Sequence, residues 1–316
     1  MNLLKTLWND LTAAFSIRQW QETLASVKSI KKENLRKTVL LLLPQMVLYY
    51  VLFSPIVAGS LYDNLLFHPT KVGHYDANFL DGTKIENVSL KSGKETLHSW
   101  FLRKSRASKV ALICHGNGGN LTNRAEIMKA LLDQNVSVFI FDYQGYGKST
   151  GSPSIPKIIS DSRVALNYLL DKEKYKQENI ILFGESLGTG LACKLSTEIK
   201  SGGIILLSPY CSILRLAREK LIWLNLYPDF MFTFDHLENA KILSKPHSLL
   251  LIIHGAKDRL IPVAHAEKLY ATAVDPKQLV LLKNSGHNDI FLNDALDFEN
   301  GLKRFLKVYI DTSKQK

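Results

Sequence analysis

The chain has 316 residues, of which 46% are hydrophobic and 22% are charged. The apolar fraction is too high for a disordered protein, and 18 glycines with 10 prolines are too few for a fibrous one. The length fits one domain of roughly 200–250 residues with an appendage better than two equal domains. The three cysteines, Cys114, Cys193 and Cys211, are an odd number without metal-ligand spacing, so the sequence predicts no disulfide framework and no metal site.

The net charge of +11 is concentrated at the two ends of the chain. Residues 1–37 carry a net charge of +4 and residues 303–316 another +4, which leaves only +3 for the long stretch between them. A face built for nucleic acid should lie within the folded domain, interleaved with aromatic or amide side chains that read the bases. The charge distribution therefore argues against a nucleic-acid partner.

The N-terminal segment, residues 1–37, is basic and partly amphipathic. Its apolar residues recur at helical spacing from Leu3 to Phe15. A helix of this kind either lies flat in the headgroup region of a membrane or packs on a partner, and the sequence does not distinguish the two.

The longest apolar run, Val39–Leu61, contains no charged residue. About 20 apolar residues suffice to cross a bilayer as a helix, so residues 38–61 are predicted to be a transmembrane signal anchor. Basic residues precede the run, which predicts a single-pass protein with a cytosolic N-terminus and the large C-terminal domain on the non-cytosolic side. The alternative is a buried helix of a soluble core; a cleaved signal peptide would normally start nearer the N-terminus.

Residues 62–316 alternate between candidate strands and candidate helices. Two strands without a helix between them, followed by strands separated by helices, predict an antiparallel start to a mostly parallel sheet of about eight strands with helices on both faces. The expected strands are Lys84–Leu90, Thr96–Arg103, Val110–Cys114, Ser137–Phe141, Ile180–Phe183, Gly203–Leu207, Ser248–Ile253 and Gln278–Leu282. The expected helices are Leu121–Gln134, Ile155–Leu170, Leu187–Ile199, Ala264–Ala273 and Asp289–Lys307.

A candidate nucleophile follows the strand Ile180–Phe183. The segment Gly184–Gly188 reads GESLG and opens a helix, which matches the tight strand-to-helix turn that presents a catalytic serine. Because a serine needs a base to activate it and an acid to orient that base, Ser186 alone predicts little.

Both partners follow Ser186 in the chain order Ser, Asp, His. Asp258 comes after the strand Ser248–Ile253, and His287 comes after the last strand. The carboxyl ends of parallel strands meet at one edge of a sheet, so the three side chains are predicted to form a catalytic triad. Taken singly, Asp258 also fits an ordinary turn or helix cap and His287 a loop histidine.

The segment His115–Asn120, which reads HGNGGN, follows the third strand. Its glycines let the backbone approach a substrate, and two N–H groups then face a developing negative charge. The backbone N–H groups of Leu187 and Asn117 are predicted to form this oxyanion hole, with Gly118 as the alternative second donor. A glycine-rich turn without a catalytic role is the other interpretation.

Other polar residues near the strand ends have structural interpretations. His115 and His254 precede glycines and are predicted to brace loops, and Asp142 is predicted to shape the loop beside the site. The remaining histidines form no ligand cluster. The sequence calls for no nucleotide, flavin or metal cofactor.

Six ordered motifs together resemble the α/β-hydrolase superfamily, and more narrowly its membrane-anchored ABHD-type serine hydrolases and related bacterial hydrolases. The motifs are HGNGGN, FDYQGYGKS, GESLG, SPYCSI, HGAKDRLIP and NSGHND, and the likeness runs from about residue 60 to 310. The segment Leu65–Pro69 also resembles a short motif that those proteins carry after the anchor. The resemblance implies an α/β-hydrolase fold in which Ser186, Asp258 and His287 are nucleophile, acid and base. Gly118 stands where alanine is frequent in the family.

An insertion at about residues 209–247 lies where this fold usually places its cap, and it is predicted to be short and helical. Its aromatic residues Trp223, Tyr227, Phe230 and Phe232 are predicted to line an apolar substrate pocket. These features predict a membrane-anchored serine hydrolase that cleaves esters or thioesters of lipids or acylated molecules. The alternatives are a serine peptidase with the same triad and a non-catalytic membrane-tethered binding module.

Overall fold

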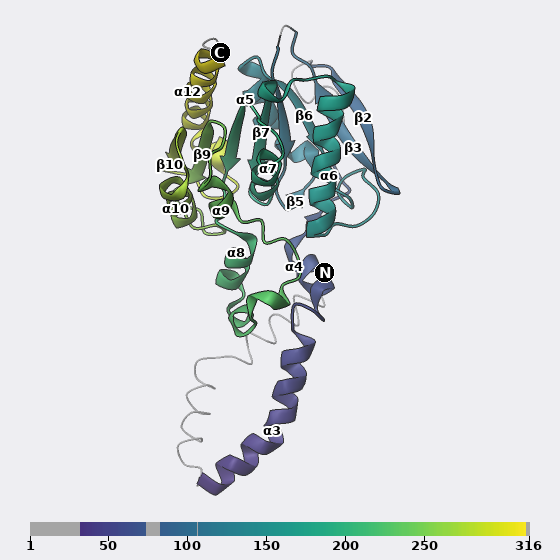
Figure 1. The fold of residues 1–316 in the computed structure, drawn as a ribbon, viewed down its shortest axis with the longest axis vertical. Helices are drawn as coiled ribbons and strands as arrows, with labels where there is room; N and C mark the ends of the chain where they lie inside the picture. Colours follow the sequence, from purple (N-terminus) through teal and green to yellow (C-terminus); the bar gives the residue numbers. More distant parts are fainter. Residues whose placement is uncertain (1–31, 74–82, 106, 314–316) are drawn as a thin grey trace. The chain divides into compact units, whose positions relative to one another are not determined.

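The computed structural model describes residues 32–73, 83–105 and 107–313 (Figure 1). The chain divides into two compact units, one ending at Gly59 and one beginning at Ser60, and each is described by itself. The amphipathic pattern predicted between Leu3 and Phe15 lies outside the described residues.

The first unit contains the helix α3 (Lys32–Leu52), which is exposed from Val39 to its end wherever its side chains are described. The apolar run predicted to be one transmembrane helix over residues 38–61 is not continuous. A turn at residues 53–58 separates α3 from α4 (Gly59–Leu66), and this turn contains Pro55, whose ring disfavours helical backbone in the residue before it. Within the described residues, no helix combines the length and the hydropathy that a bilayer span requires.

The second unit is built on an eight-stranded sheet with the strand order β10-β9-β8-β7-β4-β6-β3-β2. The pairs β2–β3 and β3–β6 are antiparallel and all the others are parallel, so the predicted antiparallel start and mostly parallel sheet are confirmed. The strands of this sheet are β2 (Ile85–Ser92), β3 (Glu95–Leu102), β4 (Val110–Cys114), β6 (Ser137–Phe141), β7 (Ile180–Glu185), β8 (Gly203–Leu207), β9 (Leu250–Gly255) and β10 (Lys277–Leu282).

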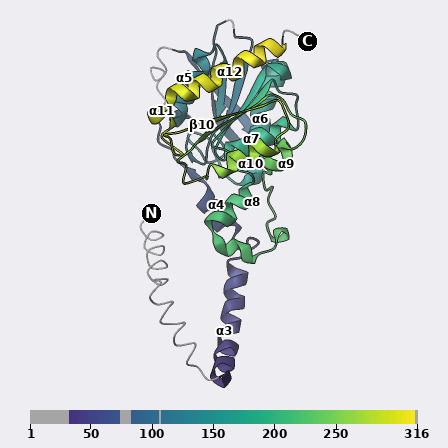
Figure 2. The same ribbon diagram turned by 90° about the vertical axis from the view of Figure 1, so that its left-hand side faces the viewer.

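Helices cover both faces of the sheet (Figures 1 and 2). The core follows from the alternation of side chains along each strand: Val110 and Leu112 of β4 pack with one cluster, and Ala111 and Ile113 with the other. The first cluster includes residues of α6, α7 and α10, and the second includes residues of α5 and α12. The main covering helices are α5 (Ala125–Asp133), α6 (Ile155–Asn167), α7 (Gly188–Ser196), α10 (Ala264–Thr272) and α12 (Ala295–Ser313).

The predicted cap follows β8 as a set of short helical segments. They are α8 (Ile213–Lys220), the 3₁₀ turns Ile222–Leu226 and Asp229–Met231, and α9 (Asn239–Leu243). The cap has a small apolar cluster of its own, made of Leu214, Leu224, Tyr227 and Phe232. It is therefore a packed substructure and not a simple loop.

The second core cluster gives a test of the fold. Phe305 of α12 is fully buried, and its ring lies against Gly203 at the start of β8. We expect Phe305→Ala to lower the free energy of unfolding by about 3–5 kcal/mol, because it leaves a cavity between helix and sheet. Urea denaturation measures this, with Leu296→Ala on the exposed side of the same helix as the control, expected to stay within about 0.5 kcal/mol of wild type. Equal effects of the two substitutions would contradict the packing described.

Candidate active site

Ser186 lies in a strained turn between β7 and α7. Its φ angle is +50°, a left-handed conformation that is rare for residues with a side chain. Its N–H donates to the carbonyl of Leu207 on the neighbouring strand over 2.8 Å. A Cβ atom at Gly188 would collide with the backbone oxygen of Cys114, and one at Gly184 would meet the start of α7. The two glycines of the motif are therefore required by close backbone approach.

The structure brings Ser186, Asp258 and His287 together, as the sequence predicts. The Nε2 atom of His287 lies 3.1 Å from Oγ of Ser186, and its Nδ1 atom lies 2.6 Å from Oδ2 of Asp258. Each residue follows the carboxyl end of a strand, β7, β9 and β10 respectively. Because a carboxylate only accepts hydrogen bonds, Nδ1 is the donor to Asp258, and the neutral ring then turns an accepting Nε2 toward the serine.

Asp258 is held by backbone as well as by His287. Its Oδ1 accepts hydrogen bonds from the N–H groups of Leu260 and Ile261, both over 2.8 Å. Burial raises the pKa of Asp258, but the hydrogen bond and charge of His287 and the Ile261 N–H outweigh burial and hold the pKa below its ordinary value. The carboxylate therefore stays ionised near neutral pH and fixes the orientation of the imidazole.

His254 braces the Asp258 loop, as predicted. Its Nε2 lies 2.8 Å from the carbonyl oxygen of Ile261 and 3.4 Å from Oδ2 of Asp258. Burial lowers the pKa of His254, in spite of the opposing effects of the Ile261 hydrogen bond and the Asp258 charge. A neutral His254 thus stabilises the Asp258 loop by donating a hydrogen bond to the Ile261 carbonyl.

The loop after β4 is fixed at Asn117, one of the two predicted oxyanion donors. The Asn117 carbonyl accepts from the His68 N–H over 2.9 Å and from the Tyr146 hydroxyl over 2.7 Å, while its side chain donates to the Leu66 carbonyl over 2.8 Å. Within the described residues, the backbone N–H groups of Asn117 and Leu187 donate no hydrogen bond. Among the described residues, neither N–H group is thus engaged in a way that conflicts with the predicted oxyanion role.

A short strand from the N-terminal side of the domain holds the same loop. β1 (His68–Pro69) pairs in parallel with β5 (Gly118–Gly119). The Thr70 N–H donates to Gly119, and the Asn120 side chain donates to the carbonyls of Thr70 and Val72. The sequence motif Leu65–Pro69 thus begins a strap, residues 66–72, along the loop that carries Asn117.

Sequence reasoning missed an ion pair that joins this loop to the Ser186 turn. The carboxylate of Glu185 lies 2.6 Å from Nε of Arg124 and accepts the Gly116 N–H over 3.2 Å. Burial raises the pKa of Glu185, but the charge and hydrogen bond of Arg124 outweigh burial and leave the pKa below its ordinary value. The sequence feature that could have revealed this ion pair is Glu185 itself, an acidic residue directly before Ser186 at a position where the five-residue motif accepts any residue.

Asp142 has the loop-shaping role that the sequence predicts. It is fully buried, and its Oδ1 accepts the Leu121 N–H over 2.7 Å and lies 3.5 Å from Nε2 of His115. The neighbouring Tyr143 hydroxyl donates to the His115 carbonyl over 2.7 Å. These contacts fix the beginning of the glycine-rich loop and the start of the helix after it.

The four aromatic residues predicted to line a substrate pocket do not gather in one place. Tyr227 and Phe232 are buried in the cap's own cluster, whereas Phe230 is 80% exposed and Trp223 is 38% exposed. Packing within the cap takes up the first two side chains. The irregular 3₁₀ turns direct the other two toward its surface.

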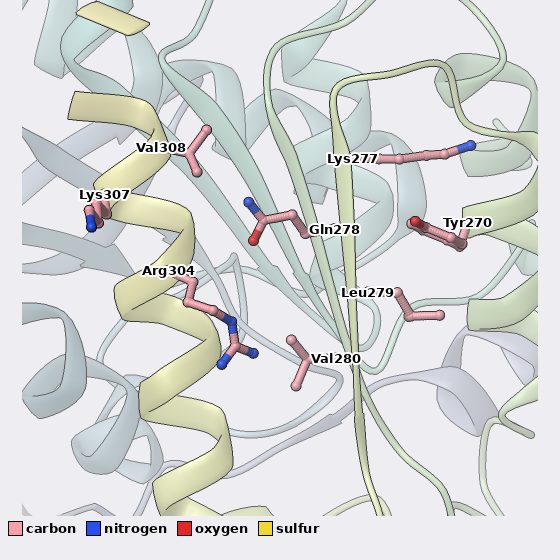
Figure 3. Close-up of a pocket in the computed structure, with 8 residues that line it drawn as sticks. All are labelled: Tyr270, Lys277, Gln278, Leu279, Val280, Arg304, Lys307 and Val308. Carbon is pink, nitrogen blue, oxygen red and sulfur yellow. The ribbon is translucent and has the colours of Figure 1, made fainter. Parts of the chain in front are cut away.

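Two further features bear on ligands. Among the described residues, no group of three or more His, Cys, Asp or Glu side chains could hold a metal ion. An open hollow of about 570 Å³ lies at the edge strand β10 and contains none of the triad (Figure 3). Its cations do not converge: Lys277 extends on one side of β10 toward Tyr270, and Arg304 lies on the other side near Val280 (Figure 3).

The mostly parallel sheet and the serine turn define a class of protein, the α/β hydrolases. A family model described as serine aminopeptidase, S33, matches residues 105–231. An uncharacterized protein of Mycobacterium tuberculosis is 33% identical over 212 residues, which cover 66% of this chain and 74% of the relative. Human alpha/beta hydrolase domain-containing protein 17B is 32% identical over 196 residues, which cover 61% of this chain and 65% of the relative.

Solved structures agree on the fold. An esterase of Pyrococcus furiosus superposes with a TM-score of 0.63 at 18% identity, covering 77% of this chain and 97% of the esterase. The chain belongs to the α/β-hydrolase superfamily, as its motifs predict. These likenesses support a serine hydrolase.

The ion pair between Arg124 and Glu185 generates a prediction. Arg124→Ala leaves the Glu185 carboxylate without its charged partner beside the nucleophile turn, so we expect a loss of about 3 kcal/mol in the free energy of unfolding. Arg163→Ala, which removes a more exposed pair with Glu198, is the matched control and should cost less than about 1 kcal/mol. Chemical denaturation of both variants measures the difference, and a loss no larger than the control's would contradict the role assigned to Glu185.

Proposed function

We propose that the chain is a serine hydrolase that cleaves carboxylic esters or thioesters with Ser186 as nucleophile, His287 as base and Asp258 as the acid that orients it. The observation that carries this proposal is the position of His287, whose two ring nitrogens lie 3.1 Å from Ser186 and 2.6 Å from Asp258. No cofactor is required, because every proton transfer in the reaction can pass through His287.

The reaction proceeds in two halves. His287 Nε2 takes the hydroxyl proton as Ser186 Oγ attacks the acyl carbonyl carbon, and Asp258 stabilises the imidazolium that forms. The backbone N–H groups of Leu187 and Asn117 donate to the resulting oxyanion. His287 then protonates the leaving group. In the second half a water molecule, deprotonated by His287, attacks the acyl carbon. The bond from that carbon to Ser186 Oγ then breaks, His287 returns the proton to Oγ, and the acid is released.

An ester or thioester substrate is supported by the fold likeness to an esterase. A peptidase is the second candidate, because the matching family model is described as a serine aminopeptidase and the same machinery attacks amides. A non-catalytic binding module is disfavoured, since such a module would not need a complete hydrogen-bonded triad.

Ser186→Ala provides the test of the nucleophile. We expect a fluorophosphonate probe to label the wild-type chain and not this variant, because the probe reacts with an activated serine oxygen. Ser208→Ala is a matched control: Ser208 also follows a strand, also has a positive φ angle, and its buried hydroxyl has no hydrogen-bond partner among the described residues. Its labelling should be unchanged. Labelling of Ser186→Ala at the wild-type rate would exclude Ser186 as the nucleophile.

Competition against the probe separates the substrate classes. Acyl esters and thioesters should slow labelling of the wild-type chain, whereas peptides with free N-termini should not. Protection by the peptides alone would favour the aminopeptidase.

We further propose that residues 38–61 attach the chain to a membrane, with the N-terminus cytosolic and the hydrolase domain on the other side. The run from Val39 to Leu61 is uncharged, and α3 exposes large apolar side chains such as Leu40 and Met46. The uncharged part of α3, residues 38–52, is about 22 Å long, which is shorter than the roughly 30 Å hydrocarbon core. The anchor we propose therefore also includes the turn and the start of α4.

Flotation with phosphatidylcholine vesicles tests this attachment. We expect the full chain to float and to resist alkaline carbonate, because an uncharged apolar run is stable in hydrocarbon. Leu43→Lys with Leu48→Lys should release it, since each lysine costs about 2.5–3.5 kcal/mol at the centre of a membrane helix. Leu292→Lys with Leu296→Lys, which changes two exposed leucines of the hydrolase domain, should still float. A wild-type chain that stays in solution would overturn the proposal.

Sidedness is read in cells from protease digestion of intact membranes. A tag at Met1 should be digested from the cytosolic face while residues 62–316 remain protected. Digestion of the hydrolase domain from that face would reverse the proposed orientation.

A further inference from the structure

The cap presents three large apolar side chains to its surroundings. Ile222 is 76% exposed, Leu226 is 69% exposed and Phe230 is 80% exposed. They alternate along the chain with Leu224 and Tyr227, which are buried in the cap's own cluster. The cap therefore buries one set of apolar side chains in its own cluster and leaves a second set largely exposed. We name Ile222, Leu226 and Phe230 the outer cap face.

The cap is tied to the loop that carries Asp258. The Lys220 side chain at the end of α8 donates to the carbonyl of Arg259 over 3.0 Å, and Arg259 directly follows Asp258. One residue earlier, Glu219 lies 2.9 Å from Nε2 of the buried His265. A surface that binds the cap is thus linked, through Lys220, to the loop that carries Asp258.

The cap is also packed on α4, the helix in which the apolar run ends. Tyr62 of α4 packs against the cap cluster. α4 exposes Leu61 and Leu65, which share one side of the helix at i, i+4 spacing. The chain enters α4 at Gly59, directly from the apolar run. A membrane that holds the apolar run is therefore only a few residues along the chain from Tyr62, which packs against the cap.

We propose that the outer cap face docks on the surface of a lipid bilayer, the same one to which residues 38–61 attach. The inference rests on the proposed membrane attachment. Three large exposed apolar side chains on one short substructure favour an interaction site there, and covalent continuity with the uncharged run selects lipid over a second copy of the chain. It follows that the site receives acyl chains from the membrane, so its substrates are membrane-borne acyl esters or thioesters.

Site-specific fluorescence tests the docking directly. Cys114, Cys193 and Cys211 are all buried, so a cysteine introduced at an exposed position can be labelled selectively. The full chain carrying Phe230→Cys is labelled with an environment-sensitive nitrobenzoxadiazole dye and bound to phosphatidylcholine vesicles. Leu292→Cys, at an exposed leucine outside the cap, is the matched control.

We expect the emission at position 230 to shift to the blue on vesicle binding and to be quenched by spin-labelled lipids, while position 292 stays aqueous. If the chain floats with the vesicles but position 230 remains as aqueous as position 292, the docking is overturned and the attachment stands. If the chain does not float, both are overturned. A blue shift at position 230 without vesicles, in a chain that sediments as a dimer, would assign the outer cap face to a second copy.

An activity assay tests the consequence for the substrate. Ile222→Ser with Leu226→Ser should lower the rate on a long-chain acyl ester presented in vesicles and leave kcat/KM for a water-soluble short-chain ester unchanged. Leu292→Ser with Leu296→Ser should change neither. Full vesicle activity in the first variant would overturn delivery from the membrane, and an equal loss on both esters would assign these side chains to the fold of the cap.

Discussion

The site depends on the close approach of two backbone segments, the start of α7 and the end of β4. A side chain at Gly188 would collide with the backbone oxygen of Cys114, so the Ser186 turn and the start of the glycine-rich loop lie in direct contact. This contact places the residue after Ser186 and the loop that contains Asn117 at the same end of two adjacent strands. The strained φ of Ser186 is sustained because packing on both sides leaves the turn no alternative.

Chain order and strand ends were enough to predict that Ser186, Asp258 and His287 lie together, because a parallel sheet collects the carboxyl ends of its strands at one edge. The sheet and its antiparallel start could also be predicted from the sequence, since an alternation of strands and helices is compatible with only a few chain topologies. The Arg124–Glu185 pair was not readable. Its members are 61 residues apart and follow no local pattern, so only the folded chain brings them to 2.6 Å. The strap at residues 66–72 was visible as a motif, but the motif did not reveal its partner.

The cap and the apolar run mark where composition stops being informative. Aromatic content predicted a pocket, yet an aromatic side chain contributes equally well to a small core, and Tyr227 and Phe232 do so. Short 3₁₀ turns have no period long enough to separate inner from outer positions. The interruption of the helix at residues 53–58 could have been predicted, because Pro55 disfavours helical backbone in the residue before it. Hydropathy alone does not distinguish this turn from the rest of the apolar run.

The strap changes how the N-terminal part of the chain relates to catalysis. Leu66 and His68 hold Asn117 through its side chain and its carbonyl, and the same residues connect α4 to the hydrolase domain. A loop that must stabilise an oxyanion needs its N–H groups fixed before the charge develops, since donors that reorganise during the reaction contribute less. The segment between the apolar run and the domain therefore holds the loop that carries the predicted oxyanion donor Asn117. Removing the N-terminal region through residue 72 would take away the backbone that holds a predicted oxyanion donor, in addition to any membrane attachment.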